Sequence, residues 1–192
     1  MKKRIFLAVA ILAIGLSSAS AQVVWGVRAG ISRPTMIASG LESWKGKFGV
    51  EIGPTMYYSL KSNFYLNSGL MFSFKSFEDN TDGVKTTINT TYLELPINIG
   101  YSIPIGKVET YLQAGPYFGY NLSAKGSYAD SGSVDIKDAF NSLNAGLGIM
   151  YGINIDRFKI EIGYHYGLTN VFKDDPDNVK LTSLFIGVGY VF

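Results

Sequence analysis

His165 is the only histidine in the sequence, and it follows Glu161 by four positions in a segment where polar and apolar residues alternate. Side chains alternate between the two faces of a β-strand, so His165 and Glu161 are expected on the same face. A histidine beside a carboxylate is a pair used in general-base catalysis, and Ser183 or Thr169 would be the candidate nucleophile of such a site. Glycines flank His165 on this face, and no further reactive group converges on it. We therefore interpret His165 as a structural residue and predict no catalytic residue and no enzymatic activity.

Two other kinds of pattern could hold a ligand. Gly146-Leu-Gly148 and Gly187-Val-Gly189 resemble half of a dinucleotide-binding fingerprint, but each lacks the third glycine and the following helix. The acidic stretches over residues 78–82 and 174–177 could bind a divalent cation or bridge lipopolysaccharide, but the first lacks the glutamate that ends an EF-hand loop. We predict that both acidic stretches are solvated loops, and that the chain binds neither a cofactor nor a metal.

The N-terminal segment has the features of a secretory signal peptide. Lys2, Lys3 and Arg4 precede an apolar run over residues 5–16, and Ala19-Ser20-Ala21 forms an A-x-A cleavage site. We predict a signal peptide over residues 1–21 and a mature domain over residues 22–192. Cleavage removes three of the 17 basic residues and none of the 15 acidic ones, so the formal net charge changes from +2 to −1. This balance implies no nucleic-acid partner, and without cysteine the chain has no disulfide.

The mature chain has a hydrophobic period of two residues, which predicts β-strands. No stretch after residue 16 approaches the ~20 apolar residues that a membrane-spanning helix needs. Strands are expected near residues 23–32, 46–60, 63–76, 86–102, 107–123, 140–153, 157–170 and 181–192. Short turns over residues 61–62, 103–106 and 154–156 alternate with long polar loops over residues 33–45, 77–85, 124–139 and 171–180. This alternation is typical of outer-membrane barrels, whose short turns lie on the periplasmic side.

One face of the predicted strands carries no charged residue, and we expect it to contact lipid. Its residues are Trp25, Val27, Ala29, Ile31, Phe48, Val50, Ile52, Met56, Tyr58, Phe64, Leu66, Leu70, Phe72, Phe74, Leu93, Leu95, Ile97, Ile99, Tyr101, Val108, Leu112, Ala114, Phe118, Tyr120, Leu122, Leu143, Leu147, Ile149, Tyr151, Phe158, Ile160, Ile162, Tyr164, Tyr166, Leu168, Leu184, Ile186, Val188, Tyr190 and Phe192. Its aromatic residues gather near both strand ends, as in the two interfacial girdles of a membrane barrel.

The opposite face is polar and is expected to line the lumen. It carries Arg28, Lys47, Glu51, Asn67, Lys75, Glu94, Asn98, Glu109, Gln113, Asn144, Lys159, Glu161 and His165. These charges balance by sign, so we predict a paired network. Its expected members are the cations Arg28 and Lys159 with some of Glu51, Glu94, Glu109 and Glu161.

Most glycines within the strands share the polar face, from Gly26 and Gly30 to Gly187 and Gly189. A glycine inside a strand costs about 0.5–1 kcal/mol relative to alanine, so one-sided placement indicates a crowded interior. About eight strands leave just enough room for side chains. The alternative is a soluble barrel of the lipocalin kind, which would bury the apolar face and expose the glycines. Pro54, Pro96 and Pro116 fit strands poorly, and we expect bulges or lost ladder bonds there.

Four segments resemble the PorT-like "outer membrane protein β-barrel domain" proteins, and the resemblance covers essentially the whole mature chain. They are Tyr92-Leu-Glu-Leu-Pro96-Ile-Asn-Ile-Gly100-Tyr, Gly115-Pro-Tyr-Phe-Gly119, Asn144-Ala-Gly-Leu-Gly-Ile-Met-Tyr151 and Tyr166-Gly-Leu-Thr-Asn170. The alternation that ends at Phe192 also resembles the C-terminal signal that the barrel-assembly machinery reads. The resemblance implies an antiparallel up-and-down transmembrane barrel in the outer membrane, and implies little about activity.

These observations lead to an expected function and to two alternatives. We expect a structural or surface-interaction barrel that presents the loops over residues 33–45 and 124–139 to an extracellular partner. A narrow passive pore is the first alternative and an outer-membrane enzyme the second. The expected partners are outer-membrane lipid and lipopolysaccharide, the barrel-assembly machinery during biogenesis, and an extracellular or periplasmic protein.

Overall fold

The computed structural model describes residues 23–38, 41–81, 84–106, 108–128, 131–173 and 178–192. The elements in chain order are β1 (Val23–Ala38), β2 (Leu41–Ser59), β3 (Phe64–Gly69), β4 (Met71–Thr81), β5 (Val84–Ile105), β6 (Val108–Tyr128), β7 (Ser131–Asp135), the 3-10 turn η2 (Lys137–Ala139), β8 (Leu143–Ile155), β9 (Phe158–Asn170) and β10 (Lys180–Val191). The predicted signal peptide lies outside the described residues.

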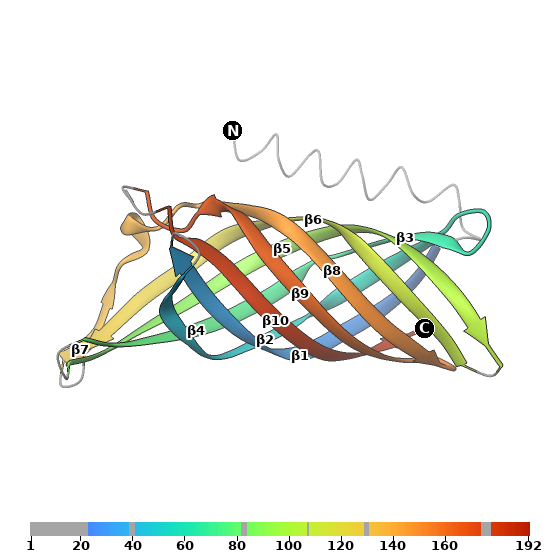
Figure 1. Cartoon of the computed structure of the whole chain (residues 1–192), viewed down its shortest axis with the longest axis horizontal. Coiled ribbons are helices and arrows are strands. Elements are labelled where there is room, and N and C mark those ends of the chain that lie inside the picture. Colours follow the sequence, from blue (N-terminus) through green and yellow to red (C-terminus); the bar gives the residue numbers. More distant parts are fainter. Residues whose placement is uncertain (1–22, 39–40, 82–83, 107, 129–130, 174–177) are drawn as a thin grey trace.

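All the strands belong to one antiparallel sheet that closes into a barrel (Figure 1). Strands β3 and β4 are two parts of one strand, interrupted at Leu70, and both pair with β2 and with β5. Strand β7 is a short addition that pairs with the outer part of β6. The first and last strands, β1 and β10, pair from Gly26–Val191 to Ile37–Lys180 and close the ring. The expected ring of eight antiparallel strands is confirmed.

The two ends of the barrel differ, as the sequence predicted. The tight β2–β3, β5–β6 and β8–β9 connections lie at one end, together with the C-terminus, at the right of Figure 1. Left-handed backbone at Asn63 (φ 65°), Gly106 (φ 66°) and Asp156 (φ 56°) lets the chain reverse there within a few residues. Outer-membrane barrels place such turns on the periplasmic side. We call this end the periplasmic end and the opposite one, which carries β7, the outer end.

The prediction of long loops is wrong for most of residues 33–45, 77–85 and 124–139, because the strands continue into these segments. Strand β1 extends to Ala38 and β6 to Tyr128, and η2 is a helical turn that the alternation did not predict. In the outer extensions the polarity of the two faces is reversed. The inward side chains Phe77 and Ile88 are apolar and buried, whereas the outward neighbour Asn89 is polar and exposed. Where the barrel extends beyond the membrane, it buries apolar side chains in its interior and exposes polar side chains to water.

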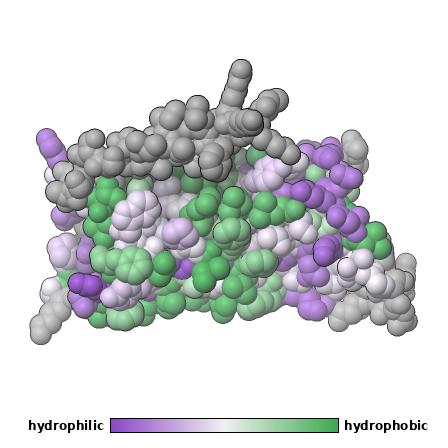
Figure 2. Space-filling view, turned by 180° about the vertical axis from the view of Figure 1, so that it is seen from behind, coloured by the Kyte–Doolittle hydropathy of each residue, from purple (hydrophilic) through white to green (hydrophobic). Residues whose placement is uncertain are grey.

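The lipid-facing assignment is confirmed for the membrane belt. None of the residues predicted on that face is buried, and most are among the large exposed hydrophobic residues. On the face seen in Figure 2, hydrophobic residues form a zone in the middle of the molecule and hydrophilic residues lie toward both ends. Aromatic rings contact one another near the periplasmic end, with centroids 4.8 Å apart for Phe64 and Tyr101 and 5.2 Å apart for Phe158 and Tyr190. No helix among the described residues is long and apolar enough to cross a membrane.

The prolines fall where the ladder is interrupted. Pro54 lies opposite the break between β3 and β4, where the Leu70 amide donates to the Pro54 carbonyl over 3.0 Å. Pairing of β5 with β6 skips from Pro96–Tyr117 to Ile99–Ala114 without a change of register. Pairing of β2 likewise skips from Thr55–Gly69 to Ile52–Phe72 without a change of register. The expected loss of ladder pairs is therefore found at both Pro54 and Pro96, and the register continues across each gap.

The crowded interior is confirmed by what surrounds its glycines. A Cβ atom at either Gly30 or Gly187 would come within 2.2 Å of the Phe185 ring, which lies inside the barrel. A Cβ at Gly152 would be 2.3 Å from the Tyr111 ring. Inward rings thus lie flat against neighbouring strands, in the space that glycine leaves.

Candidate functional site in the barrel lumen

A buried ion-pair network occupies the middle of the lumen, and Arg28 is at its centre. Arg28 Nη2 lies 3.0 Å from Glu51 Oε1, and Arg28 Nη1 lies 3.7 Å from Glu161 Oε2. The other carboxylate oxygen of Glu161 accepts a hydrogen bond from the Tyr111 hydroxyl over 2.5 Å. The guanidinium also lies over the Phe185 ring, 5.1 Å from its centroid. One arginine therefore pairs with two carboxylates, which are contributed by β2 and β9.

A second buried ion pair joins Lys75 of β4 to Glu94 of β5. The Lys75 ammonium donates to Glu94 Oε1, and both side chains are buried. The ammonium also lies 5.3 Å from the centroid of the Tyr92 ring. The predicted network of paired lumen charges is confirmed, but Lys75 rather than Lys159 is the second cation that pairs with a carboxylate.

Lys159 is held differently from the prediction. No described carboxylate lies within 4.0 Å of its ammonium. Its ammonium lies instead 4.1 Å from the centroid of the Tyr111 ring and 4.4 Å from that of Tyr57. Both distances are within the range of cation–π attraction. Lys47, also predicted inside the lumen, lies near the outer end with 51% of its side chain exposed and pairs with Glu78 over 3.0 Å.

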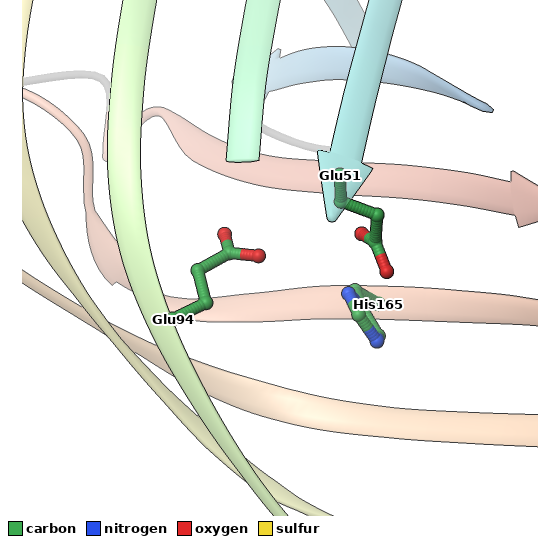
Figure 3. Close-up of side chains that lie close together, drawn as sticks. All are labelled: Glu51, Glu94 and His165. Atoms are coloured by element: carbon green, nitrogen blue, oxygen red, sulfur yellow. The ribbon is translucent and has the colours of Figure 1, made fainter. Parts of the chain in front are cut away.

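His165 lies close to one carboxylate from each of the two ion pairs (Figure 3). The carboxylates of Glu51 and Glu94 and the His165 imidazole point toward one another from β2, β5 and β9. One potential ligand atom from each lies within 4.8 Å of the others, an arrangement that could hold a metal ion. Both carboxylates, however, already pair with Arg28 and Lys75, whose charges oppose a metal cation. The absence of a metal site stays a prediction.

The arrangement around His165 offers little for hydrolysis. The imidazole stacks on Tyr117 with ring centroids 5.0 Å apart. Ser183 is the direct cross-strand neighbour of His165, but its buried hydroxyl makes no hydrogen bond to it. The Thr169 hydroxyl is bonded to the Ala145 backbone, whose amide donates to it over 2.9 Å. Neither candidate nucleophile therefore contacts a base.

An apolar core closes the lumen on the outer side of this network. It is formed by strand residues and by the segments next to η2 and before β10. Its buried members are Met36, Phe77, Ile88, Tyr92, Ala124, Phe140, Val171, Val179 and Leu181. Phe140 and Phe172 bridge the two outer segments, with ring centroids 4.7 Å apart. Among the described residues this layer consists of packed apolar side chains, which disfavour the passage of water and ions.

The periplasmic end of the lumen is open instead. A cavity of about 460 Å³ lies there, with Lys159 at its inner side and Tyr57 and Tyr65 on its wall. Glu109 and Asp156 contribute carboxylates to the same cavity. The lumen thus has three layers: an apolar core at the outer end, a network of two cations and three carboxylates in the middle, and a vestibule toward the periplasm.

Sequence reasoning placed the charged residues on the inner face but missed the aromatic residues that hold them. Tyr57, Tyr111 and Phe185 all face the lumen and contact a cation. Their position on the polar face, beside inward glycines, is the sequence signal that could have identified them. Nothing in the sequence shows which carboxylate each cation reaches, because that depends on the stagger of the closed ring.

Comparison with known proteins agrees with this architecture. Residues 17–173 match the family model described as "Outer membrane protein beta-barrel domain". Similar solved structures include Neisserial surface protein A (18% identity, TM-score 0.52, covering 88% of this chain and 97% of that chain). They also include the attachment invasion locus protein Ail of Yersinia pestis (17% identity, TM-score 0.50, covering 89% of this chain and 99% of that chain). A third is the outer membrane enzyme PagL (11% identity, TM-score 0.52, covering 86% of this chain and 98% of that chain). At these identities the likeness shows the fold alone. The comparison with curated proteins gave no match.

Proposed function

Because the chain belongs to the outer membrane protein β-barrel domain family, we propose that it is a closed outer-membrane barrel that acts by presenting its outer hairpins to a partner outside the cell. The closed lumen carries this proposal. The apolar core at the outer end and the ion-pair network below it fill the cross-section. Because the interior is occupied, the surface at the outer end is the part of the barrel that is available to a partner outside the cell.

The outer hairpins supply such a surface. Strands β4 and β5 pair as far as Thr81–Val84, and β6 carries the added strand β7. Val134 of β7 is 53% exposed at the outer end, where no lipid is available to cover it. Backbone pairing and the apolar core hold these hairpins in place, so a partner meets a preformed surface.

A narrow passive pore is the second candidate, and the periplasmic vestibule favours it. That cavity of about 460 Å³ would form half of a channel if the outer core opened. We regard catalysis as absent, because neither candidate nucleophile in the lumen contacts His165. The outer membrane enzyme PagL shares the fold, but at 11% identity that likeness brings no reaction to this chain.

Three finer assignments are part of the proposal. Placement among the PorT-like members rests on the Leu93-Glu-Leu-Pro96 segment, and export by a cleaved signal peptide rests on residues 1–21. The proposed partners are outer-membrane lipid and lipopolysaccharide, the barrel-assembly machinery, and an extracellular protein that meets the outer end.

Site-specific photo-crosslinking in intact cells tests the surface role. A crosslinking residue is placed at Val134, on the outer hairpin, or at Ile105, the last residue of β5 before a periplasmic turn. The two positions are 53% and 60% exposed. We expect a discrete adduct from position 134 that is lost when the cell surface is treated with protease. Adducts from position 105 alone, or from neither position, would contradict the proposal. A pull-down with the intact outer-membrane protein then identifies the partner.

A further inference from the structure

The periplasmic vestibule contains a buried cation, Lys159, whose ammonium has no described carboxylate within 4.0 Å. Arg28 pairs with Glu51 and Glu161, and Lys75 pairs with Glu94. These pairs use all the fully buried carboxylates of the described lumen. Lys159, 6% exposed, is held over aromatic rings and lines the vestibule. Cation–π contacts fix the position of its ammonium and leave it able to bind an anion.

The vestibule also presents negative charge at a defined distance from Lys159. Glu109 pairs with Asn154 across β6 and β8, and Asn154 pairs with Lys159 across β8 and β9. The backbones of Glu109 and Lys159 are therefore two strand spacings apart, which is about 10 Å. Both side chains line the same cavity. One cationic and one anionic position thus face a common space.

Aromatic and amide groups complete the wall between these charges. The Tyr57 and Tyr65 rings are tilted against each other with centroids 6.1 Å apart, and both line the cavity. Asn154 lines it between Glu109 and Lys159 and offers both a donor and an acceptor. A cavity of about 460 Å³ with an apolar wall and a few polar groups is of the size that holds small molecules.

We propose that this vestibule binds the zwitterionic form of a short peptide, of about two residues, from the periplasm. The peptide carboxylate pairs with Lys159, its ammonium lies toward Glu109, and an apolar side chain packs on the tyrosine rings. Two extended residues span about 7 Å, a length that bridges charged side chains reaching inward from backbones about 10 Å apart. A singly charged ligand leaves one of the two charged positions without a partner.

Matched ligands test this on the unaltered protein in lipid nanodiscs. The probes are the dipeptide Ala-Phe, its N-acetylated form, which lacks the ammonium, and its C-terminal amide, which lacks the carboxylate. Binding is measured by calorimetry, with empty nanodiscs as the blank. We expect each blocked form to bind about tenfold more weakly, because each loses one charge-assisted hydrogen bond. Equal binding of the three probes, or no binding above the blank, would overturn the proposal.

Two variants then assign each end of the ligand. Glu109→Gln should remove the preference for the free ammonium while keeping that for the free carboxylate, and Lys159→Gln should do the reverse. Lys125→Gln, at an exposed position near the outer end, is the control and should bind all three probes like the native protein. Glu109 is only half-buried, so this variant gives a readout even if Lys159→Gln fails to fold. A Glu109→Gln protein that still prefers the free ammonium would refute the assignment.

Discussion

The Lys75–Glu94 ion pair allows the most exact test of the lumen network. Lys75→Met leaves the Glu94 carboxylate buried without its cation, and Glu94→Leu leaves the Lys75 ammonium buried without its anion. Breaking a buried pair by removing one partner costs about 3–5 kcal/mol. With side-chain exposures of 3% and 5%, water cannot replace the missing partner. Each single variant should therefore lose about that much free energy of unfolding.

The double variant Lys75→Met/Glu94→Leu distinguishes a pair interaction from a packing defect. It replaces the pair by apolar side chains, an exchange that is often close to neutral. We expect it to be more stable than either single variant. Asp138→Asn, at an exposed position in η2, is the surface control and should stay within about 0.5 kcal/mol of the native protein.

The assay is a urea titration of protein folded into lipid vesicles. Trp25 is 54% exposed on the lipid-facing side, so its fluorescence reports insertion and unfolding. The free energies of unfolding of the native protein, the two single variants and the double variant together give the coupling energy of the ion pair. Single variants as stable as the Asp138→Asn control would show that the lumen is wet. A double variant whose loss equals the sum of the single losses would show that the two charges do not interact.

Three further predictions concern packing, assembly and location. Gly115→Ala should prevent stable folding in micelles, because the new Cβ would lie 2.0 Å from the Ile97 carbonyl oxygen. The control Gly132→Ala should fold normally, because no atom lies within 4 Å of its Cβ position. Equal refolding yields of the two variants would refute the close approach at Gly115. Deleting Phe192, whose amide donates to the Trp25 carbonyl over 2.9 Å, should lower outer-membrane yield in cells more than refolding yield in micelles; an unchanged outer-membrane yield would exclude a role as assembly signal. The intact protein should stay with outer membranes after carbonate or high-salt washing, because its belt exposes large apolar residues; release as a soluble monomer would contradict membrane insertion.

The membrane belt could be predicted from the sequence because one rule applies throughout it. Lipid outside and a packed polar lumen inside give a strict alternation, so residues such as Ile99 and Glu94 are assigned by parity alone. The tight periplasmic turns followed from breaks in that alternation. These assignments needed no knowledge of which strands are neighbours.

The outer extensions could not be predicted by the same rule, because the solvent changes there. Beyond the lipid, water contacts the outward face, so Met36 and Phe77 turn inward while polar residues turn outward. In these extensions the polar residues lie at the positions that carry apolar residues in the membrane belt. A prediction that requires apolar residues at those positions therefore takes the extensions for polar loops. The partners of Lys159 were missed for a different reason. Its contacts with Tyr57 and Tyr111 join residues far apart in the sequence and depend on the three-dimensional closure of the ring.

Conductance of the purified barrel in a planar bilayer tests the central claim, that the lumen is closed. The account predicts no resolved current steps, because the apolar core around Met36 and Phe140 and the ion pairs of Arg28 and Lys75 fill the cross-section. A general porin reconstituted under the same conditions shows that insertion is detected. Stable, ohmic single-channel steps from the native protein would contradict the account and favour a passive pore.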